Sequence, residues 1–96
     1  MPDIRATIAS SKRSQVEFLL IDIDSAFTFL NYARTTTNTE TRVRNQRNAR
    51  TAYDAVARLA SRPNLSGSNV SIVWDRLADL KRALELLGEK FTSTQI

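Results

Sequence analysis

Apolar residues recur along this chain at steps of three and four, the spacing of one side of a helix, in three successive segments. The pattern predicts helices over about residues 14–36, 38–61 and 69–87. The first apolar stripe comprises Val16, Leu19, Leu20, Ile23, Phe27, Leu30 and Ala33. The second comprises Ala49, Ala52, Tyr53, Val56, Leu59 and Ala60. The third comprises Val70, Val73, Trp74, Leu77, Leu80, Leu84 and Leu87, which predicts that Trp74 is buried in the core.

Local signals set the expected ends of these helices. Ser14 with Glu17, and Thr37 with Glu40, have the spacing of a capping box, in which a hydroxyl and a carboxylate bind backbone amides at a helix start. We therefore expect the first helix to begin near Ser14 and the second near Thr37. Gly88 follows the last apolar residue of the third segment and predicts that this helix ends there.

The connections predict how the helices are arranged. A short threonine-rich stretch, 35–39, joins the first two, so they should form an antiparallel hairpin. Pro63 and the polar residues 64–69 predict a loop before the third helix, which can close the groove of the hairpin. We expect one all-α domain over residues 1–96, an antiparallel three-helix bundle with a short irregular amino-terminal arm and a fraying carboxyl-terminal tail.

The composition argues against catalysis. The chain has no cysteine and no histidine, so it lacks thiolate chemistry and the commonest side chain for general-base catalysis and metal binding. Asp22 and Asp24 are two positions apart, which on a helix turns them about 200° from each other, too far for a catalytic carboxylate pair. Its two glycines form no phosphate-binding loop. We predict no enzyme activity, no catalytic residues, no cofactor and no metal.

Positive charge is concentrated in the middle of the chain. The segment from Arg34 to Arg62 holds seven arginines against two acidic residues, a net charge of +5, whereas the rest carries −1. Five arginines fall opposite the apolar stripe of the second helix and are a candidate surface for a nucleic acid or another polyanion: Arg44, Arg47, Arg50, Arg58 and Arg62. The alternative is an ordinary solvated helix face. No aromatic residue interleaves with these arginines for base stacking, so nucleic acid is not the favoured partner.

The first helix has a second apolar stripe, opposite its core stripe. This stripe consists of Phe18, Ile21, Phe29 and Tyr32. If the bundle buries only the other side, these residues form an exposed patch of the kind found at protein interfaces, and we predict a homodimer. The alternative is that the amino-terminal arm, the carboxyl-terminal tail or the third helix covers them.

Polar residues are expected to meet near the turn of the hairpin. Late residues of the first helix should face early residues of the second in an antiparallel pair. The expected cluster comprises Asp24, Asn31 and Tyr32 with Arg42, Asn45 and Asn48. Such a cluster either binds a small ligand or forms a hydrogen-bond network that fixes the register of the two helices.

The sequence favours a cytoplasmic protein outside the membrane. The first fourteen residues contain no apolar run, and the most apolar stretch, 18–30, carries Asp22 and Asp24. We therefore expect a small helical protein-interaction module that self-associates through its first helix or binds another protein. The alternative is a polyanion-binding protein that uses the arginines of the second helix.

Overall fold

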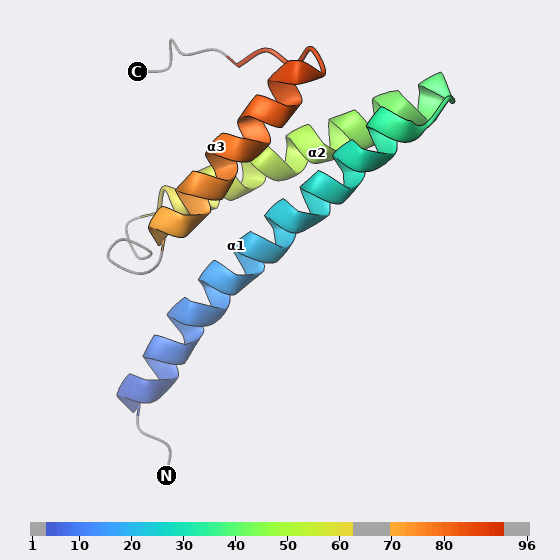
Figure 1. The fold of residues 1–96 in the computed structure, drawn as a ribbon. Helices are drawn as coiled ribbons and strands as arrows, with labels where there is room; N and C mark the ends of the chain where they lie inside the picture. The colour runs from blue at the N-terminus through green and yellow to red at the C-terminus, as the bar shows by residue number, and fades with distance from the viewer. Residues whose placement is uncertain (1–3, 63–69, 92–96) are drawn as a thin grey trace.

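The fold consists of three helices in the part of the chain that the structure, a computed structural model, describes: residues 4–62 and 70–91, with side chains from residue 15 onward. The helices are α1 (Ile4–Thr35), α2 (Thr39–Ala60) and α3 (Val70–Leu86). Figure 1 shows α1 and α2 as an antiparallel hairpin with α3 lying against both. The predicted all-α three-helix bundle is confirmed. The loop predicted at residues 64–69 lies outside the described residues.

The core lies where the three apolar stripes meet. Its largest fully buried side chains are Ile23, Leu30, Val56, Val73, Leu77, Leu80 and Leu84. Ala49 and Ala60 face the same core from α2, where their small size allows the helices to approach closely. No described polar or charged side chain is buried, so the core is held by apolar packing alone.

The start of α1 differs from the prediction. The helix begins at Ile4 rather than near Ser14, so the irregular arm expected over residues 1–10 is wrong from Ile4 onward. Residues 4–14 contain neither glycine nor proline, and Pro2 precedes the helix in a position that proline tolerates. This segment has no apolar stripe, which is why periodicity missed it. In Figure 1 it runs past the ends of α2 and α3.

The turn between α1 and α2 is capped by Asn38, one residue later than predicted. The Asn38 side chain accepts a hydrogen bond from the backbone N–H of Thr41 at 2.9 Å. The Asn38 N–H in turn donates to the Thr36 hydroxyl at 3.2 Å. The capping box expected at Thr37 is therefore wrong, since asparagine caps a helix start better than threonine does.

Gly88 ends α3 as predicted and sends the chain back toward α2. Its φ of 97° lies in the left-handed region that favours glycine. The N–H of Gly88 donates to the Glu85 carbonyl and that of Glu89 to the Leu84 carbonyl, the bonding pattern of a Schellman motif. We call residues 87–91 the carboxyl-terminal turn. The expected fraying is wrong for Glu89 and Phe91, which pack against α2, while residues 92–96 lie outside the described part.

Candidate interaction surfaces

The second apolar stripe of α1 is largely exposed. Phe18 is 65% exposed, Ile21 57% and Tyr32 60%. Phe29 is half-buried and packs against the core, so the predicted patch loses one of its four members. Ser25, also exposed, lies between Ile21 and Tyr32 on the same side of the helix. We call Phe18, Ile21, Ser25 and Tyr32 the outer face of α1.

The outer face carries three large, exposed apolar side chains along one side of α1. With about 200 Å² for each large side chain, Phe18, Ile21 and Tyr32 together expose roughly 350 Å², an area that on a monomer is often functional. The exposed apolar residues of α3 are different, because the ion-paired Asp79 lies between Ile72 and Leu86 on their side of the helix. The outer face of α1 is therefore the stronger candidate for a protein interface.

Four of the five predicted arginines point into solvent, three from α2 and one from just after its end. Arg44, Arg47, Arg58 and Arg62 are all exposed. Among the residues that the structure describes, no acidic side chain forms an ion pair with any of them. Arg44 to Arg58 extend over about 21 Å of helix axis, and Arg62 follows two residues after the end of α2. We call these four residues the arginine strip.

Arg50 does not belong to that strip, and its assignment to the exposed face is wrong. It donates to Glu89 at 3.2 Å, to the Lys90 carbonyl at 2.9 Å and to Asp54 at 3.1 Å. Its guanidinium carbon also lies 3.9 Å from the ring centre of Phe91. Arg50 therefore holds the carboxyl-terminal turn on α2, and its guanidinium group is already bound to partners within the chain.

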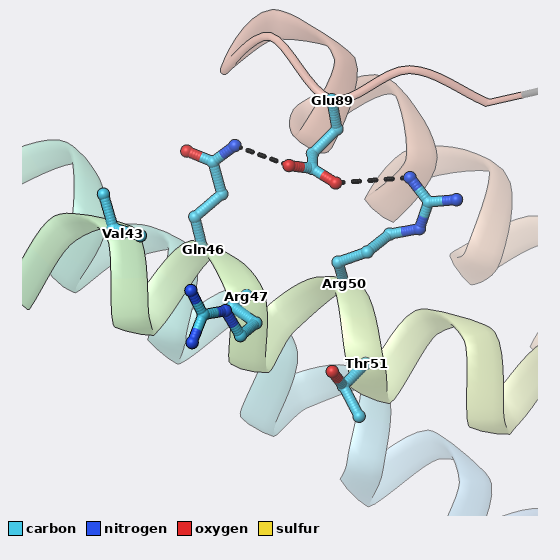
Figure 2. Close-up of a pocket in the computed structure, with 6 residues that line it drawn as sticks. All are labelled: Val43, Gln46, Arg47, Arg50, Thr51 and Glu89. Carbon is cyan, nitrogen blue, oxygen red and sulfur yellow. Dashed lines mark hydrogen bonds and ion pairs between the residues drawn. The ribbon is translucent and has the colours of Figure 1, made fainter.

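Other contacts complete the docking of this turn. Gln46 donates to Glu89 at 2.8 Å, so the Glu89 carboxylate is held from both sides, as Figure 2 shows. Phe91 meets Tyr53 edge to face at 4.9 Å between ring centres. Lys81 of α3 lies 5.3 Å from the Phe91 ring. Hydrophobic periodicity could not predict the role of Glu89 and Phe91, because two residues that follow a helix end are too few to form a repeating pattern.

A shallow pocket of about 260 Å³ lies beside the docked turn. It is lined by Val43, Gln46, Arg47, Arg50, Thr51 and Glu89. Gln46 and Arg50 point at Glu89 and are already hydrogen-bonded to it, whereas Arg47 points away (Figure 2). The pocket therefore lacks the convergent, unoccupied polar groups that fix a small ligand.

The structure does not form the predicted polar cluster near the hairpin turn. Asp24 pairs with Arg76 of α3 at 2.8 Å instead of approaching α2. Arg42 donates to the Thr36 carbonyl and Asn45 to the Thr41 carbonyl, both local bonds. The remaining members, Asn31, Tyr32 and Asn48, are exposed. The prediction of this cluster is wrong, because Asp24 lies on the side of α1 that faces α3.

Trp74 is 41% exposed, and the prediction that it is buried in the core is wrong. The buried positions of α3 are Val73, Leu77, Leu80 and Leu84, a narrow stripe. Trp74 lies one position, or about 100°, past Val73 and falls at the edge of that stripe.

Tyr53 is the one described side chain for which a pKa shift stands out. Burial raises the pKa of Tyr53 above its ordinary value of 10.0, and the nearby carboxylates of Asp54 and Glu85 raise it further, while Arg50 lowers it. The Tyr53 phenol, which meets the Phe91 ring edge to face, therefore holds its proton to a higher pH than a free tyrosine does.

The described residues contain no group of three or more acidic, histidine or cysteine side chains placed to hold a metal ion. None of the helices in the described ranges combines the length and apolar character needed to cross a lipid bilayer. Comparisons with family models, with characterised proteins and with solved structures give no match for this chain.

Proposed function

We propose that this chain is a protein-interaction module that self-associates through the outer face of α1. The observation that carries the proposal is the exposure of Phe18, Ile21 and Tyr32, each above one half, along one side of a single helix. The opposite side of the same helix buries Ile23 and Leu30. Large apolar side chains gathered on one exposed side of a helix cost free energy in water, and covering them with a second surface is favourable.

The size of the strip predicts an association of modest strength. Two copies together would cover roughly 700 Å² of apolar surface from these side chains, less than the total of about 1,200 Å² or more that stable, specific interfaces bury. The dimer should therefore dissociate on dilution. Because its contacts are apolar, added salt should leave it intact or strengthen it.

Light scattering coupled to size exclusion tests this proposal, at several protein concentrations and at about 50 and 500 mM salt. We expect a dimer at both salt concentrations and a monomer for Ile21→Asp, which places a charge in the outer face of α1. Ile72→Asp is the matched control, because Ile72 of α3 is exposed to a similar extent, 49%, outside the outer face of α1. A wild-type monomer at the highest concentration, or equal loss in both variants, would refute self-association through α1.

A second candidate function, binding of a polyanion such as nucleic acid, is favoured by the arginine strip. Its four guanidinium groups have no acidic partner among the described side chains, so they are available to phosphates. The same chromatography with a short nucleic-acid duplex distinguishes the two candidates. Co-elution of a monomer with the duplex at low salt only, lost in Arg47→Gln/Arg58→Gln, would put this function first.

A further inference from the structure

The outer face of α1 is nearly symmetric about Ser25. Phe18 and Tyr32 lie seven residues on either side of Ser25, and Ile21 and the half-buried Phe29 lie four residues on either side. In two antiparallel helices that cross at Ser25, residues equally distant from the crossing lie at the same height along the pair. Phe18 of one copy would then lie level with Tyr32 of the other, and Ile21 level with Phe29.

We propose that two copies of this chain associate through antiparallel α1 helices, with the two-fold axis passing through Ser25. The proposal rests on the proposed self-association and adds its symmetry and register. Such an interface is isologous, so it closes after two copies and does not extend into a filament. In this register each large apolar residue of the face lies level with an apolar residue of the second copy.

The size of the side chain at the crossing point favours this register. Helix axes that pack together lie 8–10 Å apart, and the closest approach needs a small residue. Ser25 is the smallest member of the outer face and lies at its centre. The core side of α1 carries α2 and α3 of its own copy, so neither helix obstructs the approach of a second α1 (Figure 1).

Charge favours the antiparallel direction over the parallel one. Exposed Glu17 and Asp22 border the outer face. In a parallel pair in register, each of these carboxylates would lie level with its own copy, and like charges at such positions repel. In the antiparallel pair, Asp22 lies level with Thr28, and Glu17 lies level with the buried Ala33. The antiparallel arrangement therefore separates the acidic side chains of the two copies.

The overlap of the two helices covers the whole outer face of α1. Crossing at Ser25 lays residues 15–35 of the two copies side by side, about 30 Å of helix. The first part of each α1, from Ile4 onward, then extends beyond the turn between α1 and α2 of the second copy.

Disulfide trapping tests the register directly, because the natural chain has no cysteine. Single variants Ser25→Cys, Asp22→Cys and Thr28→Cys change exposed positions, and air oxidation with a copper catalyst supplies the oxidant. A disulfide needs Cα atoms within about 7 Å, and self-pairs at position 22 or 28 lie about 9 Å apart along the axis of an antiparallel pair. We expect Ser25→Cys to give about ten-fold more covalent dimer than Asp22→Cys or Thr28→Cys alone.

The outcomes separate this proposal from the one on which it rests. Ser71→Cys, exposed on α3, is the control for random collision and should stay uncross-linked. Self-cross-linking of Asp22→Cys as strong as that of Ser25→Cys would show a parallel pair. A dimer by light scattering without Ser25→Cys cross-linking would overturn the register and leave self-association standing. A monomer by light scattering would overturn both.

Discussion

The carboxyl-terminal turn and the outer face of α1 both carry aromatic residues outside the main apolar stripes. The aromatic residue of the turn is covered, whereas those of the outer face are exposed. Phe91 lies against Tyr53 and Arg50 of α2, so the chain itself covers it. Phe18 is 65% exposed, and no other element of the described fold covers it. The comparison teaches that an apolar residue outside a helical stripe indicates an interface only where the rest of the chain leaves it uncovered.

The difference arises from where the chain can turn. Gly88 adopts a left-handed φ, which reverses the chain after α3 and brings Glu89 and Phe91 onto α2. Phe18 lies within a 32-residue helix, where the direction of its side chain is fixed by the rotation that buries Ile23. It can be covered only by something outside the hairpin.

The same truncation in the two regions should give the largest contrast. Phe91→Ala removes the edge-to-face contact with Tyr53 and the cation–π contact with Arg50, and should lower the free energy of unfolding by about 1.5–3 kcal/mol. Phe18→Ala should change it by less than about 0.5 kcal/mol when measured at a concentration where the protein is monomeric. Urea unfolding followed by circular dichroism measures both. Equal losses would show that the outer face is covered within the chain.

A smaller effect is expected from the glycine that directs the turn. No atom lies within 4 Å of the Cβ that an alanine at Gly88 would add, so Gly88→Ala introduces no clash. The φ of 97° nevertheless disfavours a side chain, and we expect a loss of about 1–2 kcal/mol in urea unfolding. Gly88→Asn is the control, since asparagine tolerates left-handed geometry better and should lose less. A loss for asparagine as large as for alanine would contradict a purely conformational cause.

The sequence predicted what repeats along the chain and missed what depends on single contacts. The three stripes predicted the helices and nearly all of the core because each is supported by many residues. By its position in the helical repeat, Arg50 lies on the same side of α2 as the exposed arginines. Only its ion pair with Glu89 of the docked turn distinguishes it from them. Asp24 was predicted to approach residues of α2, because the register predicted for the hairpin ignored α3, which supplies Arg76. Trp74 lies at the border of a stripe, where a rotation of a few tens of degrees decides its burial.

The smallest expected effect concerns Tyr53, which Phe91 of the carboxyl-terminal turn contacts. Burial raises the pKa of Tyr53 in the folded chain above 10.0, while the unfolded chain ionises near that value. Above pH 10 the unfolded chain thus binds fewer protons than the folded one, so this contribution to stability is complete below pH 10 and declines as the pH rises through the folded pKa. Tyr53→Phe should reduce the alkaline decline in the free energy of unfolding, measured by urea unfolding at a series of pH values from about 9 upward. An unchanged decline in this variant would mean that burial against Phe91 does not affect the Tyr53 phenol, and the docked turn would then protect α2 less than its contacts indicate.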